Sequence, residues 1–500
     1  MFEQIKRLGT DTAIYGVSTI LGRFLTFLLT PLYANILARD ELGIVATVYA
    51  YIAFLNVLYG YGMESAFFKF TSTFEFGDRK QNFSVPFISV GMTSAVLSGV
   101  LAWQSGFFAG VINLSPLYRD IVTYAAWILL LDSLAIIPFA SLRMARKVKR
   151  FATLKLINIG VNVACNVIFL VFFNMKVEGV FLSGVISSAL TLTLLIPTIL
   201  EHYSPRWSAT LYAAMLKFGL PYVPAGIATM MIQVIDRPIL ESLTDKATVG
   251  LYQANYRLGI FMMLVVSMFD FAWRPFFLSN ASEPGAKQLF ARVLTYFVLL
   301  TSAIFLSVSF FIDDIVMVPI FFGRSLLPEP YWAGLTIVPL VLLAYMFLGM
   351  SNNMVAGIYI EKKTQYLPGI TFVGAGVNVA VNFLLIPSLG IMGAAIATLL
   401  SYAVMAMVLY AVVQRIYPIQ YEFGRIAKIA FAAAVVFGIH HLVVPGSFEL
   451  AWELILLSLF AALMYWMKFF QPSELRRLTS LFVRRASPPS PTDTNSSSME

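Results

Sequence analysis

The chain has 500 residues, of which 59% are hydrophobic and only 12% are charged, and its mean hydropathy is +0.81. So few charges cannot cover the surface of water-soluble domains, so the composition excludes an ordinary soluble protein. A net charge of +8 would suggest nucleic-acid binding in a soluble protein, but here the lysines and arginines lie mostly beside apolar runs, and we expect no nucleic-acid partner. The single cysteine, Cys165, excludes an internal disulfide and a cysteine metal cluster.

Apolar runs of about twenty residues, the length that crosses a bilayer as an α-helix, recur along the whole chain. The start, Met1 to Arg7, is polar and basic, and no small-residue cleavage site follows the first run, so we expect a retained helix rather than a removed signal peptide. Proline inside many runs predicts kinks that neighbouring helices stabilise. The sequence therefore predicts an all-α integral membrane protein with about fourteen transmembrane helices, near 12–35, 42–66, 83–105, 118–140, 152–173, 178–200, 211–240, 248–274, 288–312, 331–358, 365–387, 390–413, 425–445 and 449–470.

Positively charged residues predict how these helices are oriented. With the N-terminus in the cytoplasm, 26 of the 34 lysines and arginines lie at cytoplasmic helix ends, 5 lie at the opposite ends and 3 lie inside the runs. This asymmetry follows the positive-inside rule, and a missed helix would invert every later loop. Both termini are therefore expected in the cytoplasm. The segment 473–500 has Arg-Arg pairs and a Ser/Pro-rich end, and we expect it to be a disordered cytoplasmic tail.

Two sets of matching residues indicate an internal repeat. The motif Gly-Val-Asn-Val-Ala-x-Asn occurs at 160–166 and again, 216 residues later, at 376–382. Three further residues recur after 207 positions, Pro31, Gly43 and Tyr49 matching Pro238, Gly250 and Tyr256. Chance similarity between apolar segments is the alternative, but asparagine is scarce at membrane depth. We predict two six-helix lobes, 1–207 and 208–418, followed by two added helices in 419–472.

The number of helices in each lobe predicts how the lobes are related. Because six is an even number, both lobes enter the membrane from the same side. They are therefore expected to be parallel repeats, related by a pseudo-twofold axis along the membrane normal. Lobes of this kind rock against each other around a central cleft, which opens alternately to each side.

Arg23 is the most prominent ionisable residue expected at membrane depth. It lies about eleven residues into the first helix, roughly 16 Å deep by helical rise, and charged residues at this depth are functional candidates. Thr19, Arg23, Thr26 and Thr30 follow i, i+4, i+7, i+11 spacing and form one polar stripe, which lines water or protein rather than lipid. We predict that Arg23 binds substrate, with a structural ion pair to Asp132 as the alternative.

Other charged residues in the runs are further candidates. The predicted substrate-binding residues, besides Arg23, are Arg257, Arg237 and Arg274. A structural pair with the adjacent Asp236 is an equal alternative for Arg237, and Arg274 forms an i, i+4 pair with Asp270 that suits an anchor near the cytoplasmic face. Candidates for coupling to an ion are four carboxylates, Asp132, Asp236, Asp270 and Glu64. Of these, Asp132 lies deepest and could carry a proton or pair with Arg23.

Asparagines form a second polar face. Asn158, Asn162 and Asn166 lie on one side of the fifth helix, and Asn378 and Asn382 are their counterparts in the eleventh. Hydrogen bonding between helices is favoured for them over binding of sugar.

Absent motifs narrow the function. The sequence has no Gly-Lys-Ser/Thr phosphate loop, no His-Glu-x-x-His and no Cys-x-x-Cys, and the longest expected outer loop, near 312–331, is short. We therefore expect a transporter rather than an enzyme, with no cofactor and no metal site.

Short segments also match a known pattern: Gly22-Arg23-Phe24, Pro31 to Ala34, Phe271 to Phe276 and both asparagine motifs. Together they resemble the polysaccharide transporter family of the multidrug/oligosaccharidyl-lipid/polysaccharide exporter superfamily, over roughly residues 8–470. The resemblance implies a bacterial inner-membrane flippase that moves an undecaprenyl-diphosphate-linked oligosaccharide to the periplasmic leaflet, as O-antigen flippases do for lipopolysaccharide. It also implies arginines in a central cavity, where Arg23 matches the family position and Arg257 and Arg274 match less closely.

The resemblance implies partners as well. These are the lipid-linked oligosaccharide, membrane lipids, H⁺ or Na⁺ as coupling ion, and a polysaccharide polymerase. A cation-coupled multidrug exporter of the same superfamily is the alternative, and it would be favoured by carboxylates rather than arginines in the cavity. A membrane enzyme is a third hypothesis, which would need catalytic groups on a larger outer loop.

Overall fold

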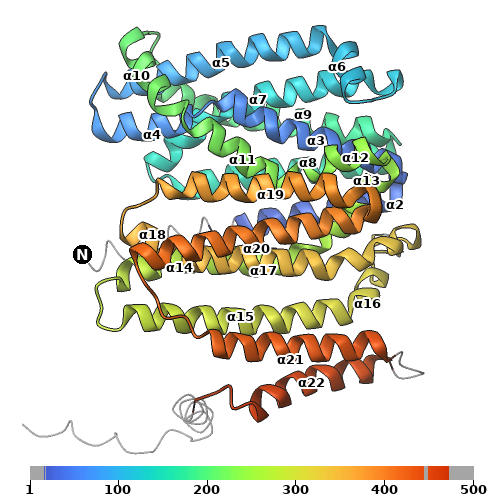
Figure 1. The fold of residues 1–500 in the computed structure, drawn as a ribbon. Coiled ribbons are helices and arrows are strands. Elements are labelled where there is room, and N and C mark those ends of the chain that lie inside the picture. Colours follow the sequence, from blue (N-terminus) through green and yellow to red (C-terminus); the bar gives the residue numbers. More distant parts are fainter. Residues whose placement is uncertain (1–15, 17–18, 322, 444–448, 472–500) are drawn as a thin grey trace, which may run out of the picture.

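The computed structural model describes residues 16, 19–321, 323–443 and 449–471, and it is a bundle of long helices lying side by side (Figure 1). The first half contains a span at Thr19–Ile36, which ends in α2 (Leu29–Ile36), followed by α3 (Arg39–Gly60), α4 (Met63–Thr73), α5 (Arg79–Trp103), α6 (Ser105–Val111), η1 (Pro116–Tyr118), α7 (Arg119–Met144), α8 (Val148–Val167), η2 (Ile168–Phe172) and α9 (Lys176–His202).

The second half has a matching succession of helices. It comprises α10 (Ala209–Gly219), α11 (Tyr222–Val234), α12 (Asp236–Leu243), α13 (Lys246–Tyr256), η3 (Arg257–Gly259), α14 (Ile260–Asn280), α15 (Ala286–Phe310), α16 (Ile312–Met317), β1 (Pro319–Phe321), β2 (Arg324–Ser325), η4 (Glu329–Ile337), α17 (Val338–Met354), α18 (Ala356–Ile360), α19 (Tyr366–Leu389) and α20 (Ile391–Ile416). Two more helices follow, α21 (Phe423–Leu442) and α22 (Glu449–Trp466).

Most of the helices predicted from apolar runs are present as membrane-length segments. Within the described residues, 12 helices are long and apolar enough to cross a membrane, and the bent pair α10–α11 makes a thirteenth candidate. The segment expected as the fourteenth span contains a shorter apolar helix, Leu450–Trp466. The chain is thus an all-α multi-pass protein. The predicted tail at 473–500 lies outside the described residues.

The single kinked helix predicted at 211–240 is divided in the structure. This segment is three helices, α10, α11 and α12, and α10 and α11 meet at an angle of 42°. Pro221 lies at the bend, where it cannot donate a backbone hydrogen bond to the preceding turn. The helix predicted at 248–274 is also interrupted, by the 3₁₀ turn η3, and the helix predicted at 42–66 breaks after Gly60 and continues to Thr73.

The two halves touch where α3 crosses α13. Gly43 lies against the backbone of Lys246, since a Cβ added at Gly43 would be 1.9 Å from the Lys246 carbonyl oxygen. The contact is reciprocal, because a Cβ at Gly250 would be 1.9 Å from the carbonyl oxygen of Arg39. Gly43 and Gly250 are 207 positions apart, as are Arg39 and Lys246, so the shift of the predicted repeat converts one contact into the other. Only glycine permits this approach of two helix backbones.

The opposite ends of the bundle have a second close contact between halves. Gly62, with φ of +76°, joins α3 to α4, and a Cβ there would lie 2.0 Å from the carbonyl oxygen of Gly219 at the end of α10. The ring of Phe218 packs edge-on against that of Phe70 in α4. Helices α4 and α10 are therefore held together beside the breaks in both spans.

The added helices lie at the margin of the bundle. Helix α21 packs against α15 and α22, and Figure 1 shows both added helices beyond α15, away from α3 and α13. Glu422, just before α21, accepts a hydrogen bond from the Thr295 hydroxyl of α15 at 2.7 Å and pairs with Arg425 at 3.0 Å. These contacts attach the margin to α15, in the C-terminal half.

Candidate functional site

A central cavity of about 800 Å³ lies between the two halves. Its walls come from the first span, α8, α11, α13, α14 and α17. The ionisable side chains lining it, tyrosines aside, are four cations and one carboxylate, Arg23, Lys155, Arg237, Arg257 and Asp270. The cavity wall therefore carries an excess of positive charge.

The predicted polar stripe faces this space. Thr19, Arg23 and Thr26 line the central cavity, and Thr30 lines a smaller pocket of about 170 Å³, called here the outer pocket. The Arg23 guanidinium donates a hydrogen bond to the Ser267 hydroxyl of α14. The alternative ion pair between Arg23 and Asp132 is wrong for this structure, because Arg23 turns toward the second half of the chain.

Arg257 lines three cavities. It belongs to the 3₁₀ turn between α13 and α14, and it lines the central cavity, the outer pocket and a third cavity in the first half. Its guanidinium lies 3.4 Å from the backbone carbonyl oxygen of Thr26. A helix interrupted at this point allows Arg257 to reach the first span.

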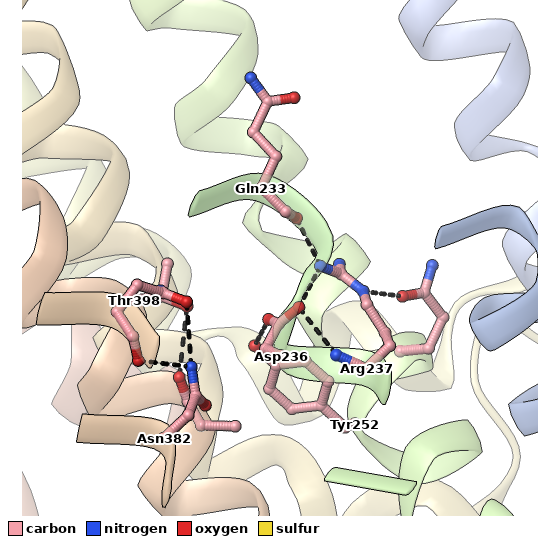
Figure 2. Close-up of polar contacts among 9 residues, drawn as sticks. Gln233, Asp236, Arg237, Tyr252, Asn382 and Thr398 are labelled. Atoms are coloured by element: carbon pink, nitrogen blue, oxygen red, sulfur yellow. Dashed lines mark hydrogen bonds and ion pairs between the residues drawn. The ribbon is translucent and has the colours of Figure 1, made fainter. Parts of the chain in front are cut away.

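Arg237 is held in a buried ion pair (Figure 2). Its guanidinium lies 2.6 Å from the Asp236 carboxylate, 2.5 Å from the Gln233 carbonyl oxygen and 3.1 Å from the Gln253 side chain. The Tyr252 hydroxyl donates to the other Asp236 oxygen at 2.5 Å. The alternative prediction, a structural pair between Arg237 and Asp236, is therefore confirmed. The Arg237 side chain also lines the central cavity.

The third cavity, named here the side chamber, lies in the first half of the chain. It has a volume of about 710 Å³, and its polar wall includes Asp132, Asn158, Asn162, Ser188 and Thr191. Asp132 accepts a hydrogen bond from the Ser188 hydroxyl at 2.7 Å. The side chamber lies beside the central cavity. Four residues, called here the junction, line both cavities: Thr26, Phe151, Lys155 and Arg257.

Lys155 is the residue at this junction that the sequence interpretation missed. It was expected among the cytoplasmic charges, yet α8 begins at Val148 and Lys155 lies two turns inside it. Its ammonium lies 4.4 Å from the centre of the Phe139 ring. A signal was present, because Lys155, Asn158 and Asn162 are spaced i, i+3, i+7 and so share one helix face.

The remaining predicted residues, Glu64, Asp270 and Arg274, lie in α4 and α14. Glu64 lines the side chamber and is paired with Arg143. Asp270 lines the central cavity and lies 3.2 Å from Arg274, whose own side chain is 56% exposed and is not part of either described cavity wall. The ion-coupling roles of Glu64, Asp132, Asp236 and Asp270 stay predictions.

The asparagines of the first half bond to neighbouring helices, as favoured from the sequence, whereas the Asn382–Asn378 bond lies within one helix. The Asn158 amide donates to the Ser187 carbonyl and the Thr191 hydroxyl of α9, at 3.0 and 2.8 Å. In both copies of the motif the second asparagine donates to the backbone carbonyl of the first at 2.8 Å, Asn166 to Asn162 and Asn382 to Asn378. Asn158 and Asn162 also line the side chamber, so each faces this cavity as well as the neighbouring helix α9.

Comparison with known proteins places this geometry in a family. A sequence profile described as polysaccharide biosynthesis protein matches residues 32–329, which is more than half of the chain. The chain belongs to the polysaccharide biosynthesis protein family. One relative of the chain is an uncharacterised membrane protein of Methanocaldococcus jannaschii. The two sequences are 22% identical over 436 residues, which cover 79% of this chain and 82% of the relative.

Solved structures show the fold of this polysaccharide biosynthesis protein. The lipid II flippase MurJ in an inward closed conformation has a TM-score of 0.71 at 16% identity, covering 95% of the chain and 99% of MurJ. A multidrug resistance MATE transporter in an inward-facing conformation has a TM-score of 0.61 at 12% identity, covering 79% and 94%. The D35N mutant of the Vibrio cholerae MATE transporter VcmN has a TM-score of 0.59 at 14% identity, covering 82% and 97%. The protein is thus a multi-pass membrane protein with a transporter fold.

Proposed function

We propose that the protein is a flippase that moves an undecaprenyl-diphosphate-linked oligosaccharide from the cytoplasmic to the periplasmic leaflet of the bacterial inner membrane. The observation that carries the proposal is the cluster of Arg23, Lys155 and Arg257 around one cavity between the two halves. Among the described residues, none of these three cations forms an ion pair with a carboxylate. They are therefore available to an anionic ligand.

The chemistry of these groups suits a diphosphate. Guanidinium groups bind phosphate oxygens with two parallel hydrogen bonds and remain charged away from water. An anionic headgroup that leaves water needs such partners, because burying an unpaired charge is costly. The oligosaccharide would cross inside the protein while the polyprenyl tail remains in the lipid.

The proposed transport cycle is alternating access by two parallel six-helix lobes, 1–207 and 208–418, in a chain of fourteen spans with both termini in the cytoplasm. The reciprocal contact of Gly43 and Gly250 supports this arrangement, because a pseudo-twofold axis predicts such symmetry. A polymerase that extends the flipped glycan is the protein partner that this function implies.

The alternative of a cation-coupled drug exporter is less well supported by the cavity. A cationic drug would need unpaired carboxylates, yet Asp270 is paired with Arg274 and Asp236 with Arg237. The MATE transporters share the fold, so fold alone does not distinguish these functions.

The test is flipping of a polyprenyl-diphosphate-linked oligosaccharide, labelled in the sugar, by purified protein in proteoliposomes. Arg23→Ala removes a charge-assisted contact of about 1.5–3 kcal/mol, so we expect flipping to fall by roughly ten- to 150-fold. Arg415→Ala, at the exposed end of α20, is the matched control and should flip normally. If the Arg23 variant flipped at the control rate, Arg23 would have no role in binding. If the unaltered protein flipped no such lipid, the flippase proposal itself would be wrong.

A further inference from the structure

The side chamber is a second polar space for which the flippase proposal alone gives no role. Its volume of about 710 Å³ lies within the roughly 300–1,000 Å³ of typical small-molecule sites. Amide, hydroxyl and carboxylate groups from three helices face it, Asp132 from α7, Asn158 and Asn162 from α8, and Ser188 and Thr191 from α9. Side chains of this kind offer both hydrogen-bond donors and acceptors.

The charges divide the adjacent cavities into two regions. Lys155 and Arg257 lie at the junction and line both the central cavity and the side chamber. Further into the side chamber the charged groups include carboxylates, Asp132 with its bond from Ser188 and Glu64 with its partner Arg143. Arg143 also lines the chamber and neutralises Glu64. The junction therefore attracts phosphate, whereas a phosphate further into the chamber would approach the negative charge of Asp132.

We propose that the side chamber holds the first sugar units of the glycan while the diphosphate lies at the junction between Lys155 and Arg257. This proposal rests on the flippase function. A neutral, hydroxyl-rich group is the ligand that fits a wall of amides, hydroxyls and a carboxylate, because every sugar hydroxyl both donates and accepts.

The arrangement also explains why the chamber opens beside Lys155. In a lipid-linked oligosaccharide the diphosphate lies between the sugar and the polyprenyl chain. With the diphosphate at the junction, the sugar extends into the side chamber, and the polyprenyl chain leads away on the side of the central cavity toward the lipid in which its tail remains. The positive residues then contact only the part of the substrate that all lipid-linked oligosaccharides share, and the side chamber contacts the part that varies.

Two kinds of soluble probe test this division in purified full-length protein. One is farnesyl diphosphate, and the others are farnesyl diphosphates carrying glucose, galactose or N-acetylglucosamine on the terminal phosphate. We expect at least one glycosylated probe to bind more tightly than farnesyl diphosphate, by roughly tenfold for one or two added hydrogen bonds. Asp132→Asn keeps the shape and an acceptor for Ser188. It should remove this gain without weakening the binding of farnesyl diphosphate, because loss of the Asp132 charge leaves Lys155 at least as attractive to phosphate.

Lys155→Met is the complementary variant, and it should weaken both kinds of probe by about the same factor. Matched controls are exposed residues on the same helices, Asp120→Asn in α7 and Lys149→Met in α8, which should bind as the unaltered protein does. Binding of farnesyl diphosphate by Asp132→Asn that is at least as tight as in the unaltered protein also shows that this variant is folded.

The outcomes separate the two proposals. If the unaltered protein binds farnesyl diphosphate and no glycosylated probe binds more tightly, the sugar chamber is wrong and the flippase proposal stands. A loss of affinity for both kinds of probe in Asp132→Asn would equally overturn the chamber. If none of these diphosphates binds the unaltered protein, both proposals are wrong.

Discussion

Replacement of Gly43 by alanine should prevent α3 and α13 from closing. The added Cβ would lie 1.9 Å from the carbonyl oxygen of Lys246 and 2.7 Å from its carbonyl carbon, whereas ordinary contacts begin at 3.4 Å. The two helices would have to separate by about 1.5 Å, and neither contacting atom belongs to a side chain that can rotate away. Gly43→Ala should therefore disfavour the conformation described here.

The size of the effect follows from the cost of overpacking. Inserting a methyl group into a closely packed contact typically costs about 1–3 kcal/mol. That cost shifts the equilibrium away from the closed crossing by roughly five- to 150-fold. Because the crossing lies at the start of both helices, beside the outer pocket, the open conformation should expose residues such as Ala46, which is 7% exposed in this structure.

The assay is the rate at which a membrane-impermeant maleimide labels Ala46→Cys, in a chain whose Cys165 is replaced by alanine. We expect the Gly43→Ala background to raise this rate by roughly the factor of the equilibrium shift. Gly99→Ala is the control, since a Cβ there meets nothing within 4 Å. Equal labelling rates in the two backgrounds, at equal thermal stability, would refute the role of the crossing in closure.

Three further substitutions have expected outcomes in thermal unfolding or in the proteoliposome assay. Asp236→Ala leaves the buried Arg237 guanidinium without its carboxylate, and it should lower the free energy of unfolding by about 3–5 kcal/mol, with partial recovery on adding Arg237→Met. Asn166→Leu leaves the buried Tyr33 hydroxyl without its 2.8 Å acceptor and should cost about 1–3 kcal/mol in thermal unfolding. Arg274→Ala removes an exposed ion pair worth about 0–1 kcal/mol, so the flipping rate should stay within roughly fivefold of that of the unaltered protein. A larger loss would show that Arg274 contributes to substrate binding.

The sequence predicted well the parts of the fold that depend on local hydropathy and helical spacing. An apolar run of membrane length has no stable conformation in lipid other than a helix, so the spans and their order were recoverable. The stripe of Thr19, Arg23 and Thr26 was recoverable for a similar reason. Helical spacing places these residues on one face, and their polarity requires that this face avoid lipid.

Breaks and partners were harder to predict. Prolines indicated kinks in 211–240, but a proline can either bend a helix or be tolerated, and neighbouring helices decide which. Lys155 was misplaced because a charge count assigns a lysine near a run's edge to the loop. The partners of Arg23 and Asp132 depended on packing between helices far apart in sequence, which one sequence does not specify.

The crossing of α3 and α13 has the geometry of an interface between two identical subunits. Residue 39 touches residue 250 as residue 246 touches residue 43, which is the rule for an isologous interface in a twofold dimer. The chain thus carries within one polypeptide a contact of the kind by which two identical subunits recognise each other. Two six-helix subunits of the same orientation, each with one such glycine, would form this interface without any linking segment.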